Sequence, residues 1–221
     1  MHSAKLSHKT IFYLAVVSLI FYLIFFFWFE SSGQKLTPDE LEAARLMQEA
    51  EREIYRCQQK VGLAPEKNPF DPMKTGLIGL ESSPLTTTLG QLEAKRTTTN
   101  PALAALLVRL LRQAGVKKGQ VVAAGASSSF PALIVATYCA TRAMGVELLV
   151  IVSIGSSQWG ANQPEFSWIS MENCLRQAGF NQHRLLALSW GGEDGSGGEY
   201  PEDLKIKLRQ EAQTLGLTFL P

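Results

Sequence analysis

The feature that most constrains this chain is an uninterrupted apolar run near its N-terminus, from Ile11 to Phe29, in which no residue is charged. About 19 residues at 1.5 Å per residue form a helix of roughly 28 Å, which matches the thickness of a bilayer's hydrocarbon core. In that core every backbone N–H and C=O group must be bonded internally, and a helix achieves this. The run therefore predicts a transmembrane helix over residues 11–29.

The charges that flank this run predict its orientation. Lys5 and Lys9 precede it, and Glu30 follows it. Because positively charged segments stay in the cytoplasm, we expect residues 1–10 to form a cytoplasmic tail of a single-pass cell-membrane protein, with the rest of the chain extracytoplasmic. The alternative is a cleaved signal peptide, whose apolar stretch is normally about 7–15 residues long and ends in an A-x-A-like site. Residues 31–33 are a weak site of that kind, which favours an uncleaved signal-anchor.

The composition excludes several function classes. About 190 residues follow the apolar run, enough for one domain with a sizeable core. The whole chain has 21 Lys and Arg against 20 Asp and Glu, a net charge of +1. Such a balance creates no long-range field for a polyanion, so we expect no nucleic-acid partner.

Histidine and cysteine are scarce. His183 is the one histidine outside the N-terminal tail, so a Ser-His-Asp triad would have to use it. The sequence has no HExxH, CxxC or multi-histidine cluster, and we expect no metal and no cofactor. The cysteines are Cys57, Cys139 and Cys174, each in a helix-type segment where a buried thiol is the simple explanation. A Cys139–Cys174 disulfide is possible in an oxidising compartment, although nothing in the sequence demands it.

An amphipathic helix is expected over residues 37–62. Thr37 and Glu40 match a capping box, and Pro38 suits the first helical position. Apolar residues recur at three- to four-residue spacing along it, so one side can be buried. We expect this helix to be a stalk that packs on the domain.

Beyond residue 76, strand-type and helix-type segments alternate. Apolar strands are expected at 121–126, 147–154 and 185–190, and helices at about 102–114, 131–144, 166–178 and 201–215. Continuous apolar strands between helices predict a Rossmann-like α/β domain over 76–221, with a mainly parallel sheet and helices on both faces. The residues from Gly216 onward resemble the start of another strand, so we expect further residues or another protein to complete the sheet.

Each expected strand leads into a loop rich in serine or glycine. The loops are 127–129, 155–160 and 191–198. Ligands of parallel sheets bind outside the carboxyl ends of the strands, so these loops predict a site at one edge of the sheet. Backbone N–H groups and hydroxyls of Ser127, Ser128 and Ser129 could hold a carboxylate or phosphate at the start of a helix. The alternative is that one serine caps the helix and the others decorate the turn.

Lys95 and Arg96 lie between threonine triplets at 86–88 and 97–99. Such a segment offers two positive charges and many donors to a carboxylate-bearing chain, and Arg96 suits a bidentate grip. The alternative is a solvated loop. If catalysis takes place without histidine, a serine activated by a neutral lysine is the natural scheme. Ser127, Ser128 and Ser129 are then the candidate nucleophiles, and Lys95 is the candidate base.

The remaining loops add two groups of candidates. Trp159 could stack on a ligand beside Asn162, although a tryptophan there is also typical of a core or a lid. Glu193, Asp194 and Glu199 could hold a divalent cation, but the EF-hand spacing is missing, which favours a solvated loop. The predicted ligand-binding residues are Thr86, Thr87, Thr88, Lys95, Arg96, Thr97, Thr98, Thr99, Ser127, Ser128, Ser129, Trp159 and Asn162.

Several segments resemble one known family. These are SSPLTTTLG and EAKRTTTNP within 77–101, GASSSFPAL at 125–133, SIGSSQWGAN at 153–162 and SWGGEDGSGG at 189–198. Together, and with the N-terminal anchor, they resemble the poly-gamma-glutamate system protein family over most of the chain. The resemblance implies a role beside the membrane machinery that makes and exports poly-γ-glutamate, a polyanion with one free carboxylate per unit. It assigns no catalytic residues, and members of the family are longer than this chain.

Three hypotheses therefore stay open. The first is an accessory component of poly-γ-glutamate synthesis or export, which binds the polymer or its membrane synthase complex on the extracytoplasmic side. The second is a serine hydrolase or transferase that acts on the polymer. The third is a structural anchor that recruits a partner subunit through the unfinished sheet edge.

Overall fold

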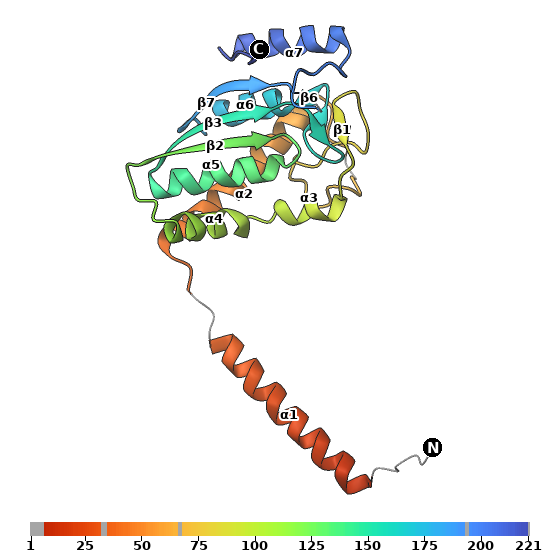
Figure 1. The fold of residues 1–221 in the computed structure, drawn as a ribbon, viewed down its shortest axis with the longest axis vertical. Coiled ribbons are helices and arrows are strands. Elements are labelled where there is room, and N and C mark those ends of the chain that lie inside the picture. The colour runs from red at the N-terminus through yellow and green to blue at the C-terminus, as the bar shows by residue number, and fades with distance from the viewer. Residues whose placement is uncertain (1–6, 32–34, 66–67, 193–194, 221) are drawn as a thin grey trace. The chain divides into compact units, whose positions relative to one another are not determined.

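The computed structural model describes residues 7–31, 35–65, 68–192 and 195–220, and the chain divides into two compact units, Met1–Leu36 and Thr37–Pro221. The first unit contains helix α1 (His8–Ser31), and none of its window from His8 to Phe27 is buried (Figure 1). That window has a mean hydropathy of 2.5, so α1 is long and apolar enough to cross a membrane. The helix expected over 11–29 lies within α1, whereas residues 1–6 of the expected tail lie outside the described residues.

The second unit begins with α2 (Pro38–Lys60), whose start has the predicted capping box. Thr37 Oγ1 accepts from the Glu40 N–H at 3.4 Å, and Glu40 Oε2 accepts from the Thr37 N–H at 2.7 Å. Met47 and Ile54 on this helix are fully buried. The helix packs on α4 (Ala102–Gln113), α5 (Pro131–Met144) and α6 (Trp168–Gln177). This helix packs on the domain, as expected, and the compact unit that contains both starts at Thr37.

The main sheet has three parallel strands in the order β2 (Val121–Ser127), β3 (Glu147–Ser153) and β7 (His183–Ser189). Ser127 pairs with Ser153, and Ser153 pairs with Ser189, so the three strands end at the same edge. Phe219 forms a parallel bridge with Leu188 of β7, as expected for a further strand after residue 216. The parallel α/β architecture is confirmed.

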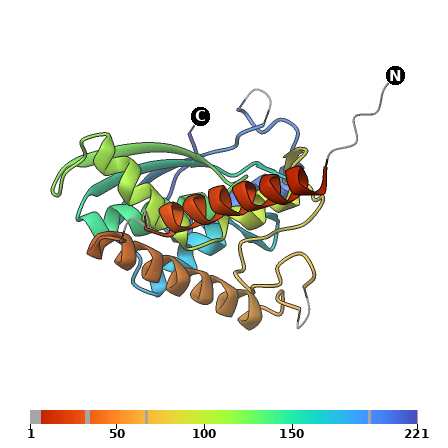
Figure 2. The ribbon, with the colours of Figure 1, turned by 90° about the horizontal axis from the view of Figure 1, so that it is seen from below.

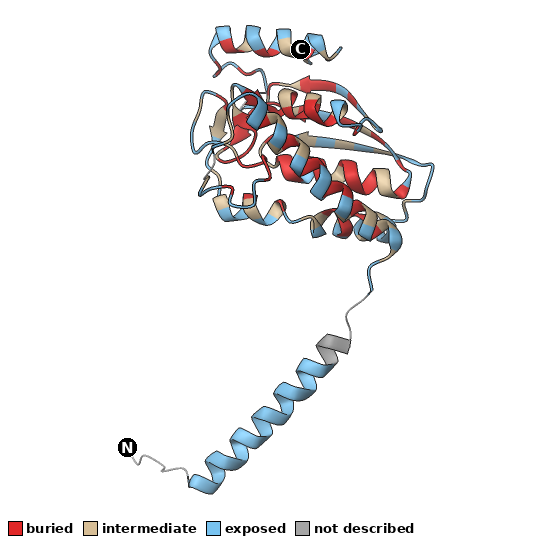
Figure 3. Cartoon of the chain, turned by 180° about the vertical axis from the view of Figure 1, so that it is seen from behind, coloured by how far each residue is buried: buried red, intermediate tan, exposed pale blue. Residues whose placement is uncertain are grey.

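Among the described residues of the second unit, helices cover one face of this sheet rather than both. Val150 and Val152 of β3 are buried, whereas Ile151 between them and Val121 of β2 are 36% and 55% exposed. The strands follow their sequence order across the sheet, and right-handed crossovers then place successive helices on the same side. The helices form two layers on that side, because α5 contacts β2 and β3 while α2 packs on α5 and α6 (Figure 2). Figure 3 shows buried residues along these helices, in the strands and in the loops around them.

Short elements surround the carboxyl edge of the sheet. They are β1 (Thr86–Thr88), which pairs in parallel with β4 (Ser156–Ser157), the antiparallel pair β5 (Asn162–Gln163) and β6 (Phe166–Ser167), and helix α3 (Leu92–Thr98). Helix α7 (Glu202–Thr214) follows the third loop and contacts α6.

A disulfide joins Cys57 of α2 to Cys174 of α6, with Cα atoms 6.3 Å apart. The Cys139–Cys174 pairing considered from the sequence is therefore wrong. Cys139 is a free, fully buried thiol of α5, and burial raises its pKa. All three cysteines lie in helices, as expected, but α2 rather than α5 brings its cysteine to Cys174.

Candidate functional site

The serine and glycine loops meet at the carboxyl edge of the sheet. The Ser157 N–H donates to Ser129 Oγ at 2.9 Å, and the Ala161 N–H donates to the Ser128 carbonyl at 2.8 Å. The Gly155 N–H donates to the Trp190 carbonyl at 2.8 Å, where the third loop begins. The convergence expected for parallel strands thus brings the first two loops into direct contact and links the third to the second.

Lys95 lies at the centre of this cluster. The segment considered as a solvated loop is helix α3, and Lys95 on it is 2% exposed. Its ammonium donates to Ser157 Oγ at 2.7 Å and to the Ser129 carbonyl, and it lies 3.5 Å from the centre of the Phe130 ring. Among the described residues no carboxylate forms an ion pair with Lys95, and burial lowers its pKa to about 8.

This arrangement supplies a lysine that is partly neutral near neutral pH, in contact with a serine hydroxyl. A neutral Nζ can accept the proton of Ser157 Oγ when that oxygen attacks a carbonyl carbon. Ser157 is 7% exposed. Ser127 Oγ donates to Ser129 Oγ at 3.0 Å, and Ser129 Oγ accepts from the Ser157 N–H, so these hydroxyls connect the exposed Ser127 to the backbone of Ser157.

The hydroxyl that Lys95 contacts is not one of the three predicted from the sequence. Ser127 and Ser129 belong to the cluster, but their hydroxyls do not bond Lys95, and Ser128 Oγ donates to the Ser153 carbonyl at 2.6 Å. The sequence does not single out Ser157, because its contact with Lys95 joins two distant segments of the chain. Ser157 lies on β4, which pairs with β1, and Lys95 lies on the helix that follows β1. A usable signal was present, since Ser157 follows a buried strand in the second converging loop.

The desolvated lysine predicts a stability that depends on pH. The pKa of Lys95 is about 8 in the folded chain and about 10.4 in an unfolded one, so the unfolded state binds more protons between these values. We expect the free energy of unfolding to rise by up to about 3 kcal/mol from pH 8 to pH 10.5 through this group. Urea unfolding across this pH range should show a clearly smaller rise in the free energy of unfolding for Lys95→Met than for the native chain. An equal rise in both would contradict the lowered pKa of Lys95.

Arg96 does not share the site with Lys95. Its Nε donates to the Phe70 carbonyl at 3.0 Å, and its guanidinium also bonds the Pro69 carbonyl and Glu93. Successive residues of a helix point about 100° apart, so the two cations diverge. The expected joint grip of Lys95 and Arg96 on one carboxylate is therefore not formed, and Arg96 instead holds the loop before residue 76.

The second threonine triplet is also occupied. The hydroxyls of Thr97, Thr98 and Thr99 donate to carbonyls of their own helix, at 2.8, 2.6 and 2.8 Å. Threonine in a helix commonly bonds the carbonyl three or four residues earlier. These three residues cap and close α3, and the structure does not bring their hydroxyls to Lys95.

The first triplet connects the loops. Thr86 Oγ1 accepts from Asn162 Nδ2 at 2.8 Å, Thr87 Oγ1 donates to the Ser156 carbonyl at 3.3 Å, and the Thr88 carbonyl accepts from the Gln158 N–H at 3.0 Å. Asn162 is fully buried, and it also bonds both backbone groups of Leu80 at 2.8 Å. Thr86 and Asn162, both predicted to bind a ligand, therefore form a hydrogen bond with each other that fixes the second loop.

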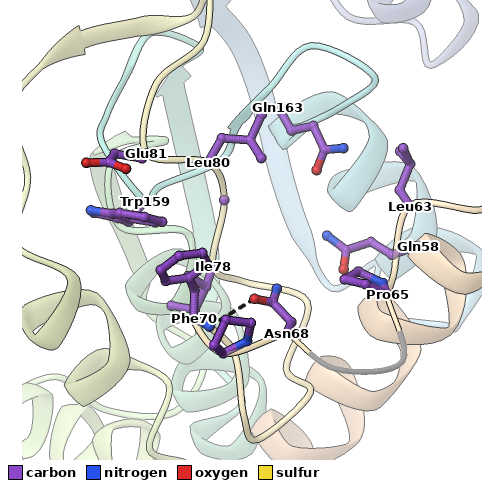
Figure 4. Close-up of a pocket in the computed structure, with 12 residues that line it drawn as sticks. Gln58, Leu63, Pro65, Asn68, Phe70, Ile78, Leu80, Glu81, Trp159 and Gln163 are labelled. Carbon is purple, nitrogen blue, oxygen red and sulfur yellow. Dashed lines mark hydrogen bonds between the residues drawn. The ribbon is translucent and has the colours of Figure 1, made fainter.

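Trp159 lines a separate pocket. Its ring centre lies 4.6 Å from that of Phe70, and both rings border a cavity of about 370 Å³ with Ile78 and Gln163 (Figure 4). Trp159 has a φ of 63°, which is uncommon outside glycine. The structure thus places this ring against Phe70 at the border of a cavity that Lys95 does not line.

His183 lies far from the serines. It begins β7, whereas the cluster lies beyond the other end of the strand, roughly 20 Å away for a strand of this length. His183 Nε2 is 2.8 Å from Glu172 Oε1, and its ring stacks on Tyr138. A triad of His183 with the serine cluster is therefore excluded.

The acidic loop offers no described metal centre. Glu193 and Asp194 lie outside the described residues. In the parts of the chain that the structure does describe, no group of three or more His, Cys, Asp or Glu residues could hold a metal ion.

Compared with protein-family models, with curated proteins and with solved structures, the chain matches none.

Proposed function

We propose that this chain is a membrane-anchored serine hydrolase or transferase, with Ser157 as nucleophile and Lys95 as base, that acts on poly-γ-glutamate outside the cell. The observation that carries the proposal is the 2.7 Å contact between Lys95 Nζ and Ser157 Oγ in a site without a described acidic partner. A structural ion pair would give Lys95 a carboxylate and keep it charged. Burial instead favours the neutral amine that a general base requires.

The chemistry follows from this pair. Ser157 Oγ attacks an amide carbonyl carbon, and its proton passes to Lys95 Nζ. Lys95 returns the proton to the nitrogen of the leaving amine as the C–N bond breaks. Water or a second amine then attacks the acyl carbon and gives a proton to Lys95 Nζ. The bond between that carbon and Ser157 Oγ breaks and Oγ regains the proton, so the outcome is hydrolysis or transfer of the acyl group.

Membrane anchoring and the outer location are parts of the same proposal. Helix α1 supports the anchor by its length and apolar composition. The Cys57–Cys174 disulfide supports an oxidising compartment, where such bonds persist. The choice of poly-γ-glutamate as the polymer rests on the family resemblance of the loop sequences.

The test is whether the full chain, in detergent micelles, cleaves poly-γ-glutamate. Cleavage is measured by the new amines that it releases. We expect Ser157→Ala to lower kcat by about a thousandfold or more, because Ser157 Oγ is the one hydroxyl of the described residues that contacts Lys95 Nζ. Lys95→Arg should lose activity to a similar degree, since arginine stays protonated. Ser82→Ala, at an exposed loop serine, is the control and should keep full activity. Full activity of Ser157→Ala would remove the enzyme proposal.

The second candidate is an accessory component that binds the polymer or its synthase without cutting. The low exposure of Ser157, at 7%, favours it because a nucleophile must be reached by its substrate. This candidate expects no released amines from the native chain, while the chain still retains the polymer on a filter.

A further inference from the structure

A second pocket lies between α2 and the segment that joins α3 to α4. It has a volume of about 490 Å³, within the range of small-molecule sites. Helix α2 contributes Glu51 and Arg52, and the loop between α2 and β1 contributes Lys74 and Thr75. Thr99, at the end of α3, also lines the pocket. Neither Ser157 nor the Lys95 side chain lines it, so the pocket goes beyond the function proposed above and does not depend on it.

Glu51 is an unpartnered acid in this pocket. The residue is 6% exposed, and its Oε1 atom is buried without a hydrogen-bond partner. The other buried carboxyl groups of the described chain are satisfied: Glu40 by Arg109, Glu172 by Arg176, and Asp71 by Thr75 and Gly76. Burial and the nearby Asp71 raise the pKa of Glu51 to about 8. A buried carboxyl group with no partner is costly, and a bound donor would relieve that cost.

Basic groups line the same pocket. Arg52 and Lys74 are exposed, and neither forms an ion pair or side-chain hydrogen bond with the described residues. Arg96 also borders the pocket, but its guanidinium is engaged by Glu93 and two backbone carbonyls. The pocket thus has one buried acid and two uncommitted cations.

We propose that this pocket binds a free α-amino acid, with the ligand's ammonium on Glu51 and its carboxylate on Arg52 and Lys74. A zwitterion satisfies both kinds of group at once, whereas a simple anion leaves Glu51 unpaired and a simple amine faces two cations. Two cations against one acid match a ligand with two carboxylates and one ammonium, so an acidic amino acid fits best. A metal ion is a poor fit, since the described residues offer no group of three acidic, histidine or cysteine ligands.

The test is calorimetric titration of the full chain in detergent micelles at about pH 8. L-glutamate and L-aspartate should bind, and L-lysine should bind at least about tenfold more weakly because its extra charge faces Arg52 and Lys74. N-acetyl-L-glutamate keeps both carboxylates but lacks the ammonium, and it should also lose about tenfold or more. Equal affinity for L-glutamate and its N-acetyl form would overturn the proposal, as would no binding of either acidic amino acid.

Variants assign the ligand groups to the pocket. Glu51→Gln keeps the shape of the side chain and should weaken L-glutamate binding about tenfold or more, whereas Glu49→Gln should change it less than about twofold. Glu49 is the matched control because it lies exposed on the same helix, paired with Arg45. The Arg52→Gln, Lys74→Gln double variant should weaken the binding of L-glutamate more than the binding of glycine, which has a single carboxylate. An unchanged affinity in Glu51→Gln, with its thermal unfolding intact, would sink the assignment.

These outcomes are distinguishable from failure of the enzyme proposal. Ser157→Ala lies outside the pocket and should bind L-glutamate as tightly as the native chain. Loss of amino-acid binding in that variant would overturn the claim that the two sites are separate.

Discussion

Reducing the Cys57–Cys174 disulfide is expected to lower the free energy of unfolding by about 4 kcal/mol. The bond closes a loop with a sequence separation of 117 residues. In the chain-entropy description, a cross-link over about 100 residues removes roughly 4.7 kcal/mol of loop entropy from the unfolded state. Because whole domains are stable by only about 5–15 kcal/mol, the loss is a large share of the total.

Urea unfolding with and without a phosphine reductant measures this effect. The Cys57→Ala, Cys174→Ala double variant is the control, since the reductant should leave its unfolding midpoint unchanged. Thiol alkylation of the denatured chain, isolated from cells, should label Cys139 but neither Cys57 nor Cys174, because the proposed location is oxidising. Full labelling of all three cysteines would contradict that location.

Glu172→Ala is expected to lower the free energy of unfolding by about 3–5 kcal/mol, the usual cost of removing one partner from a buried charged network. Glu172 of α6 is fully buried. Its carboxylate accepts from Arg176 Nε at 2.6 Å, from His183 Nε2 at 2.8 Å and from the Tyr138 hydroxyl at 3.3 Å. Removing it leaves the other three polar groups without this partner, and two of them are almost inaccessible to water.

The same residue predicts a loss of stability in acid. Burial alone raises the pKa of Glu172, but the hydrogen bonds from His183 and Arg176 outweigh it and hold the pKa below its ordinary value. A carboxyl group with a lowered folded pKa stabilises the chain above its unfolded pKa, and this contribution disappears as the pH falls through the folded value. The native chain should therefore lose stability below about pH 4.5 more steeply than Glu172→Ala.

Denaturation by urea at about pH 7 measures the main effect. Glu165→Ala, at an exposed acid just before α6, is the matched control and should change the free energy of unfolding by less than about 0.5 kcal/mol. A loss below about 1 kcal/mol in Glu172→Ala would show that water or another group replaces the carboxylate.

Much of the fold follows from local patterns. The capping box at Thr37 and Glu40 correctly starts α2, and the helix expected at 131–144 coincides with α5. Strands expected at 121–126 and 147–154 match β2 and β3 to within one residue. Such signals depend on residues a few positions apart, so no knowledge of distant contacts is needed.

Which faces of the sheet the helices cover could not be predicted from local patterns. Continuous apolar runs predict strands that are buried on both faces. Ile151 and Leu186 are nevertheless 36% and 47% exposed on the open face. An apolar side chain fits either face of a strand, and which face the helices cover depends on the order of the strands in the sheet.

The candidate site, too, has features that local patterns predict and features that depend on distant contacts. That the loops after β2 and β3 lie together follows from parallel strands ending at one edge. The partner of Lys95 does not, since its contact with Ser157 depends on the parallel pairing of β1 with β4 and on how α3 lies against both loops. Lys95 and Arg96 point in different directions because α3 is a helix. The threonine-rich composition of this segment does not favour a helix, so the sequence did not predict one.

The amino-acid order alone therefore accounts for the apolar α1, for the alternation of strands and helices, and for the edge of the sheet at which the loops gather. Each of these depends on solvation or backbone geometry within a short stretch of chain. The pairing of Cys57 with Cys174, the burial of Glu51 without a partner and the meeting of Lys95 with Ser157 arise only from folding. They join residues far apart in the chain, and packing between layers and register between strands set those distances.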